Sequence, residues 1–239
     1  MTPNNIIFAD LSTYTPKKSM AFYEHTFKWN YYESNDYYVA YLGNTQVTGL
    51  YETPDKFQQM GMPHFWMMYI QVSNVDATIR LAKQFGAIIE MSYELIGFGK
   101  VALLRDPLGA GFTIYEGDKL NNTRTKNTKN TLVWNELHVS NANAVIPFYE
   151  GIFNWKITET QDGLYPILNQ EQEHIADILE ISNQYKGKYE YWVCTFGVES
   201  LETTKNLILE NDGNLINQEG SRALFTDNSG EAFFYIQEV

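Results

Sequence analysis

Two stretches of this chain repeat one pattern, FYEHTFKW at residues 22–29 and FYEGIFNW at residues 148–155. Phenylalanine, tyrosine, glutamate, phenylalanine and tryptophan recur in the same places, and the second stretch begins at position 148 instead of 22, an offset of 126 residues. In a chain of 239 residues, this offset indicates a duplicated half. The sequence therefore predicts two copies of one domain.

Each half is itself predicted to contain a repeat. A strand-like run precedes each copy of the pattern, and apolar residues such as Phe22, Tyr23 and Phe27 then recur at helical spacing. Pro16 is suited to the first turn of that helix. Three short β-like runs follow, and the same order begins again at His64. We therefore expect an α+β fold with four βαβββ units in two domains.

A polar stretch, DKLNNTRTKNTKN at residues 118–130, separates the two halves. It lacks apolar periodicity and is typical of an exposed linker. The sequence thus predicts a first domain at residues 1–117, a linker at 118–130 and a second domain at 131–239.

The composition narrows the classes of function. The net charge of −12 argues against a nucleic-acid partner, because phosphate binding requires clustered Lys and Arg. The single cysteine, Cys194, lies in an apolar run and is expected to be a buried structural thiol in a reducing compartment. The sequence shows no signal peptide and no apolar run of membrane-spanning length. A cytoplasmic protein without a membrane partner is the simplest expectation.

Three motifs together resemble the vicinal oxygen chelate superfamily. They are the repeated FY pattern, VSNVDA at residues 72–77 and DPLGAGF at residues 106–112, set within paired βαβββ units. The superfamily includes glyoxalase I, extradiol dioxygenases and bleomycin resistance proteins, and the chain is most similar to tandem two-domain glyoxalase-like proteins. The resemblance implies half-open barrels whose concave faces hold a divalent metal through His and Glu side chains. If the chain is an enzyme, which stays open, the resemblance implies a glyoxalase I-type lyase or an extradiol dioxygenase-type activity.

The resemblance assigns four metal-ligand positions to each domain, and this chain departs from the pattern at nearly all of them. The positions hold Phe8, Gly49, Met67 and Thr113 in the first domain and Trp134, Asp177, Val193 and Phe234 in the second. Asp177 is the single carboxylate among them. No cofactor is therefore expected, although a divalent metal held by Asp177, Glu136 and His138 is a possible alternative.

Strand alternation extends the predicted cavity walls, since residues two apart on a strand share a face. The result is an aromatic-walled pocket with a few polar groups, a composition typical of small-molecule sites. The predicted lining comprises Phe8, Asp10, Ser12, Met67, Tyr69, Gln71, Thr113 and Tyr115 in the first domain, and Trp134, Glu136, His138, Val193, Thr195 and Phe234 in the second.

Glu136 and His138 form the candidate catalytic pair, because a carboxylate orients an imidazole and raises its basicity. The alternative is a buried strand histidine satisfied by a neighbouring hydrogen bond. The other histidines, His25, His64 and His174, are expected to face solvent.

Three functions remain open. The first is metal-independent binding of a small hydrophobic or aromatic molecule in a β-lined cavity. The second is a divalent-metal-dependent lyase or dioxygenase. The third is a structural module whose cavities are filled by large side chains such as Phe8 and Trp134. The expected partner is a small molecule, and the protein is expected to be a monomer or a homodimer.

Overall fold

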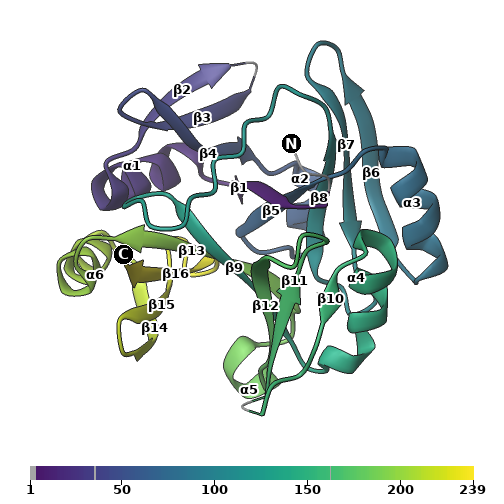
Figure 1. Cartoon of the computed structure of the whole chain (residues 1–239). Coiled ribbons are helices and arrows are strands. Elements are labelled where there is room, and N and C mark those ends of the chain that lie inside the picture. Colours follow the sequence, from purple (N-terminus) through teal and green to yellow (C-terminus); the bar gives the residue numbers. More distant parts are fainter. Residues whose placement is uncertain (1–3, 35, 162) are drawn as a thin grey trace. The chain divides into compact units, whose positions relative to one another are not determined.

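The computed structural model describes residues 4–34, 36–161 and 163–239 (Figure 1). It contains two eight-stranded sheets, one from each half of the sequence. The strand order is β2-β3-β4-β1-β5-β8-β7-β6 in the first sheet and β10-β11-β12-β9-β13-β16-β15-β14 in the second. The same order of strand, helix and three strands occurs four times, which confirms the predicted α+β fold of four βαβββ units.

The first sheet comprises β1 (Ile6–Thr13), β2 (Asn30–Ser34), β3 (Tyr37–Leu42), β4 (Thr45–Glu52), β5 (Phe65–Gln71), β6 (Ile88–Leu95), β7 (Gly99–Arg105) and β8 (Gly111–Glu116).

The second sheet comprises β9 (Leu132–Val139), β10 (Lys156–Ile157), β11 (Leu164–Leu168), β12 (His174–Glu180), β13 (Tyr191–Val198), β14 (Asn214–Glu219), β15 (Arg222–Thr226) and β16 (Phe233–Glu238).

The helices begin where the local sequence allows a helical start. Pro16 lies in the first turn of α1, where its missing N–H costs no hydrogen bond. Asn74 and Ser200 cap α3 and α6 with side-chain oxygens that accept backbone hydrogen bonds from Ala77 and Thr203. The helices are α1 (Pro16–Phe27), α2 (Asp55–Gln59), α3 (Val75–Gln84), the 3-10 turn η1 (Ala142–Ala144), α4 (Ile146–Phe153), α5 (Asn183–Lys186) and α6 (Leu201–Glu210).

The chain packs as two compact units, each drawn from both halves of the sequence. Unit one comprises Met1–Ile7, Met68–Asn122 and Asn135–Val193, and unit two comprises Phe8–Met67, Thr123–Trp134 and Cys194–Val239. The strands of each sheet come from one predicted domain, whereas each compact unit contains residues of both predicted domains. The domain boundaries therefore stay a prediction. Within the predicted linker, Leu120 and Thr123 are buried.

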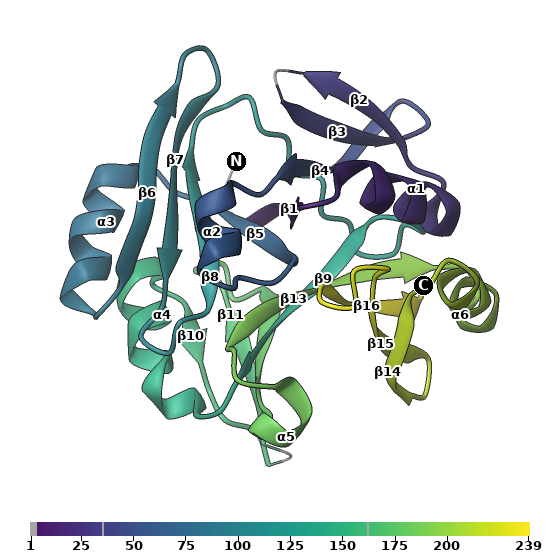
Figure 2. The ribbon, with the colours of Figure 1, turned by 180° about the vertical axis from the view of Figure 1, so that it is seen from behind.

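In unit one, α3 and α4 lie side by side (Figures 1 and 2). Aromatic rings of α4 pack against Phe112 of β8. The hydroxyl of Tyr149 accepts a hydrogen bond from Trp192 Nε1 at 2.9 Å and donates one to Asp106 Oδ2 at 3.0 Å. Asp106 Oδ1 accepts hydrogen bonds from three backbone N–H groups of the turn that follows it. Each large ring buried in this core contributes roughly 2–3 kcal/mol to stability.

Unit two repeats this arrangement with α1 and α6 (Figure 2). The hydroxyl of Tyr23 accepts from Trp66 Nε1 at 3.1 Å and donates to Asp227 Oδ2 at 3.2 Å. Cys194 belongs to this core and is buried, as predicted. The repeated Phe-Tyr pattern of the sequence is therefore a core motif that ties a helix to the last turn of a βαβββ unit.

Candidate acid–base site

The site is built on β9, the central strand that carries Glu136 and His138. Leu137 and Val139 belong to the core of unit one, so alternation turns Glu136 and His138 to the opposite face. On the neighbouring strand β12, which runs parallel to β9, Asp177 stands opposite Glu136. The strands thus bring two carboxylates side by side on the face that lies away from the core.

His138 connects Glu136 to Tyr191, the first residue of β13. Its Nε2 lies 3.2 Å from Glu136 Oε2, and its Nδ1 lies 3.4 Å from the Tyr191 hydroxyl. His138 and Glu136 are buried, whereas Tyr191 is half-buried. When Glu136 is ionised, the His138 Nε2–H donates a hydrogen bond to the carboxylate, which leaves Nδ1 to accept a hydrogen bond from the Tyr191 hydroxyl.

A second imidazole partners the second carboxylate. His174 Nε2 lies 2.7 Å from Asp177 Oδ1, and the His174 side chain is 44% exposed while that of Asp177 is 10% exposed. Each of the two neighbouring carboxylates therefore has a histidine within hydrogen-bond distance.

An ion pair holds the chain segments on either side of this site. Glu190 accepts hydrogen bonds from the backbone N–H and the hydroxyl of Ser140, which directly follows β9. Lys186 Nζ, at the end of α5, lies 3.0 Å from Glu190 Oε1, and the Lys186 side chain is fully buried. Because Glu190 directly precedes Tyr191, this contact fixes the start of β13 relative to the end of β9.

The possible metal ligands of unit one are two carboxylates and two histidines. Across the part of the chain that the structure describes, no group of three or more His, Cys, Asp or Glu side chains is placed to hold a metal ion. His138 lies within hydrogen-bond distance of Glu136, and His174 lies within hydrogen-bond distance of Asp177. Metal sites of this type need three or more converging donors from the protein.

In unit two, the corresponding place on β1 is taken by Asp10, which accepts a 3.0 Å hydrogen bond from the Tyr37 hydroxyl. Gly49 stands opposite Asp10 on β4. A Cβ added at Gly49 would lie 1.9 Å from the Tyr37 hydroxyl oxygen, so Tyr37 fills the space that a side chain at Gly49 would need. The first predicted domain therefore offers a phenol where the resemblance implied a metal ligand.

The other predicted lining residues divide into two groups. In the first group, core residues alternate with Phe8, Met67, Tyr69, Thr113 and Thr195, so these five side chains lie on the face opposite the core. Their role in lining a ligand site stays a prediction.

In the second group, three predicted lining residues make contacts with other parts of the protein that the sequence did not indicate. Phe234 lies in the core of unit two, where its ring contacts Phe22 and Phe196, so the prediction that it lines a cavity is corrected. The Tyr115 hydroxyl donates to the carbonyl of Phe98 and accepts from two backbone N–H groups. The Trp134 ring is covered by the guanidinium of Arg124, 4.9 Å from the ring centroid.

The remaining histidines were expected to face solvent. His25 does so, and His174 is partly exposed. His64 is buried instead, because its Nδ1 hydrogen-bonds with the Thr13 hydroxyl at 2.9 Å and its ring packs edge-on against Tyr14.

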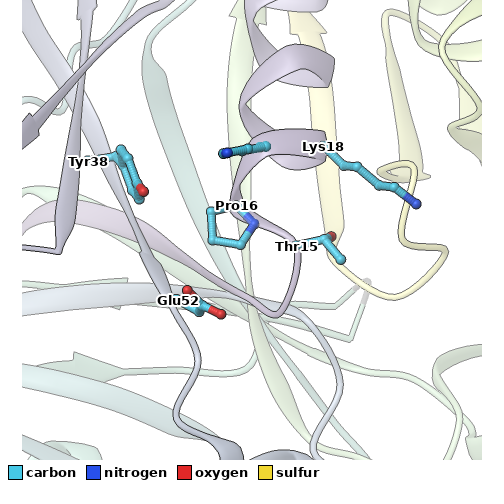
Figure 3. A pocket seen from close by; sticks show the side chains of 6 residues that line it. Thr15, Pro16, Lys18, Tyr38 and Glu52 are labelled. Carbon is cyan, nitrogen blue, oxygen red and sulfur yellow. The ribbon is translucent and has the colours of Figure 1, made fainter.

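Two surface hollows lie away from these residues. One, of about 260 Å³, lies at the start of α1 (Figure 3) and is lined by Thr15, Pro16, Lys17, Lys18, Tyr38 and Glu52. The other, of about 380 Å³, lies in unit one and is lined by Asn74, Asp76, Glu94, Gly99, Lys100, Glu116 and Gly117. Neither contains a predicted site residue.

Sequence reasoning missed Tyr191, His174 and Tyr37. Tyr191 precedes Val193 by two residues on a strand, so alternation alone would have placed it on the same face as Val193 and Thr195. For Tyr37, the sequence indicated only a cluster of tyrosines on adjacent strands, for which cross-strand packing is the favoured interpretation. Its ring reaches its place because Gly49 leaves room.

Comparisons with known proteins agree with this architecture. Residues 7–114 match the sequence profile of the family described as Glyoxalase/Bleomycin resistance protein/Dioxygenase superfamily. The candidate glyoxylase CFP32 of Mycobacterium tuberculosis is 24% identical over 250 residues, which cover 97% of this chain and 93% of that protein. The anthracycline biosynthesis protein DnrV of Streptomyces peucetius is 24% identical over 218 residues, covering 86% of this chain and 78% of that protein.

Solved structures share the fold at low identity. The 2,3-dioxygenase LapB from Pseudomonas sp. KL28 superposes with a TM-score of 0.66 at 12% identity and covers 100% of this chain and 93% of its own. The Mn(II)-bound glyoxalase from Novosphingobium aromaticivorans gives a TM-score of 0.65 at 11% identity, covering 99% of this chain and 82% of its own.

Within the described residues, every helix is too short or too polar to cross a bilayer.

Proposed function

Because residues 7–114 match the family described as Glyoxalase/Bleomycin resistance protein/Dioxygenase superfamily, we propose that the chain belongs to this superfamily, that it binds a small hydrophobic or aromatic molecule without a divalent metal, and that it exchanges a proton with this molecule through Tyr191. The observation that carries this proposal is the hydrogen-bonded series from Tyr191 through His138 to Glu136. Tyr191 is its one half-buried member, so we assign it the contact with the ligand.

The series is suited to moving a proton in either direction. When the Tyr191 oxygen accepts a proton from an acidic C–H or O–H group of the ligand, its own proton passes to His138 Nδ1. The imidazolium then formed is stabilised by the carboxylate of Glu136, and the ligand retains the electron pair of the broken bond as an anion. The reverse transfer returns the proton to the ligand.

The proposal is tested on chain freed of metal with a chelator. A library of aromatic and hydrophobic compounds is screened for an increase in melting temperature, and each binder is then followed by NMR in D₂O for exchange of an acidic proton. We expect binding without metal, retained in Tyr191→Phe, together with exchange that is lost in this variant. Tyr189→Phe, which changes an exposed tyrosine two positions earlier, serves as the control and should keep the exchange. A library without a single binder would contradict the proposal.

A second candidate is a divalent-metal-dependent lyase or dioxygenase. It is favoured by the opposed pair Glu136 and Asp177, which sit on neighbouring strands with a histidine bonded to each. Binding of one metal per chain, with loss of that metal in both Glu136→Gln and Asp177→Asn, would put this candidate ahead of the first.

A further inference from the structure

A buried ion pair lies beside the proton-transfer series of unit one. The Lys186 side chain, at the end of α5, is fully buried, and its Nζ lies 3.0 Å from Glu190 Oε1. The ammonium also donates hydrogen bonds to the carbonyl oxygens of Tyr189 at 3.0 Å and Gly187 at 3.5 Å. The three N–H donors of the lysine thus have three acceptors, and one of these is the Glu190 carboxylate. The ion pair therefore restrains Glu190 to one position.

The same carboxylate links the two strands that carry His138 and Tyr191. Glu190 Oε2 accepts a hydrogen bond from the backbone N–H of Ser140 at 2.9 Å, and Oε1 accepts one from the Ser140 hydroxyl at 2.7 Å. Ser140 follows His138 by two residues, and Glu190 directly precedes Tyr191. Both ends of this link are therefore next to the hydrogen bond between His138 and Tyr191.

The hydrogen bond between Tyr191 and His138 is sensitive to small displacements. The Tyr191 hydroxyl lies 3.4 Å from His138 Nδ1, a distance longer than most protein hydrogen bonds. A displacement of about 1 Å at a reacting group can lower a rate by roughly a hundredfold. The position of the start of β13 thus decides whether Tyr191 can pass its proton to His138.

Net stability is a weak explanation for the ion pair of Lys186 and Glu190. Removing two charges from water is unfavourable and offsets much of their mutual attraction, so apolar residues of the same size often stabilise a protein equally well. A buried ion pair nevertheless imposes one geometry, because breaking it leaves a buried charge without a partner. We therefore look for its role in the geometry that it fixes.

The other copy of the repeat differs at the series and at the link together. At the offset of 126 residues, Tyr191 corresponds to Phe65, and Glu190 corresponds to His64. Phenylalanine has no hydroxyl to place against a proton acceptor. The glutamate therefore occurs in the copy that has a tyrosine for it to position.

We infer that Glu190, restrained by Lys186, is the positioning residue that sets the contact between Tyr191 and His138, an inference that rests on the proton transfer proposed above. The link from Glu190 to Ser140 keeps the start of β13 against the end of β9, so the phenol stays within reach of Nδ1. Glu190 acts through Tyr191 and not by contact with the ligand. Loss of the link should therefore slow proton transfer without weakening ligand binding.

The first test is nitrogen-15 NMR of the His138 ring in the full chain without ligand. In Glu190→Gln, the amide oxygen can still accept a hydrogen bond from Ser140, but the negative charge that restrains the side chain against Lys186 is gone. We expect the Nδ1 resonance to move towards its value in Tyr191→Phe.

Glu116→Gln is the matched control. Glu116 also accepts a backbone N–H in unit one, that of Val75 at 2.8 Å, but at the start of α3. This variant should leave the His138 Nδ1 resonance where it is in the wild type.

A double variant separates positioning from stability. Glu190→Gln alone leaves the buried charge of Lys186 without its partner and should lower the melting temperature. Adding Lys186→Met removes that charge with a side chain of similar length, so the melting temperature should recover at least in part. The Nδ1 resonance should stay displaced, because the charged link to Ser140 is still missing. A purely structural role would restore both readouts together.

Exchange of a ligand proton in D₂O connects the link to the proposed function. For a ligand whose proton exchanges in the wild type, Glu190→Gln should slow the exchange by roughly tenfold to a hundredfold and keep the affinity. If no ligand proton exchanges in the wild type while Nδ1 responds to Glu190→Gln, the proposed function fails and the positioning of Tyr191 is supported. An unchanged Nδ1 resonance in Glu190→Gln, full exchange in this variant, or recovery of the resonance together with the melting temperature in the double variant would each overturn the inference.

Discussion

The hydroxyl of Tyr149 in α4 donates a 3.0 Å hydrogen bond to the carboxylate of Asp106, which lies in the turn between β7 and β8. Tyr23 and Asp227 repeat the contact at 3.2 Å in unit two. In each unit, a buried tryptophan donates to the same tyrosine oxygen. Burial and the neighbouring carboxylate raise the pKa of Tyr149 well above 10, so the phenol remains a hydrogen-bond donor at neutral pH.

We expect Tyr149→Phe to lower the free energy of unfolding by about 1–3 kcal/mol, because it removes the hydrogen bonds that the tyrosine oxygen makes with Asp106 Oδ2 and with the Trp192 N–H. Tyr23→Phe should cost a similar amount for the same reason. Tyr32→Phe, at a position that is 62% exposed, is the matched control and should change stability little. Urea denaturation measures all three, and equal midpoints for Tyr149→Phe and the control would show that the contact contributes nothing.

The raised pKa of the buried Asp106 carboxyl group leads us to expect that stability depends on pH. Burial raises the pKa of Asp106 from 3.8 to about 6, even though Tyr149 and three backbone N–H groups favour the charged form. Because the folded pKa lies above the unfolded one, the stability contributed by this group is fully present below about pH 4 and is lost as the pH rises through 6. At pH 7 the buried charge costs about 3 kcal/mol.

The variant Asp106→Asn isolates this effect from the other carboxylates of the chain. The unfolding free energy of the variant minus that of the wild type should rise by about 2 kcal/mol between pH 4 and pH 7. Denaturant titrations at intervals of pH measure this difference. A difference that stays constant over the range would mean that Asp106 titrates alike in the folded and unfolded chain.

Gly49 should tolerate no side chain while Tyr37 is in place. The Cβ of an alanine would lie 1.9 Å from the Tyr37 hydroxyl oxygen, so we expect Gly49→Ala to cost about 1–3 kcal/mol. Shortening the partner in the double variant Gly49→Ala, Tyr37→Ala should make the combined cost smaller than the sum of the two single costs. Strict additivity in the double-mutant cycle would show that the two residues do not compete for this space.

The tautomer of His138 is a direct consequence of its contacts. With Nε2 donating to Glu136 and Nδ1 accepting from Tyr191, the neutral ring should carry its proton on Nε2. Nitrogen-15 NMR of labelled protein distinguishes the two ring nitrogens. Tyr191→Phe should change the Nδ1 resonance and leave Nε2 almost unaltered, whereas Glu136→Gln should do the reverse. Protonation on Nδ1 in the wild type would contradict the proposed direction of proton transfer.

The periodicity of the sequence was enough to predict much of the fold and part of the candidate site. The repeat at residues 22–29 and 148–155 predicted four βαβββ units, and alternation on β9 predicted that Glu136 and His138 share a face. The place of Phe234 was assigned one residue out of register, since its neighbour Tyr235 faces away from the core. A slip of one residue exchanges the two faces of a strand.

Contacts between segments that are distant in the chain could not be predicted from the sequence. The bond between Tyr149 and Asp106 depends on which helix packs on which turn, and periodicity holds no information on that choice. The pair His174 and Asp177 was missed for a different reason. A polar strand end next to acidic residues is typical of a solvent-facing histidine, and its contact with the buried Asp177 follows from local backbone geometry.

The most direct test of the central claim is the metal content of chain purified without a chelator, measured by mass spectrometry together with thermal shifts on adding zinc, nickel, manganese and iron(II). The account predicts a stoichiometry near zero and no rise in melting temperature, because His138 with Glu136 and His174 with Asp177 are engaged in separate pairs. Binding of about one metal per chain, lost on Asp177→Asn, would contradict it.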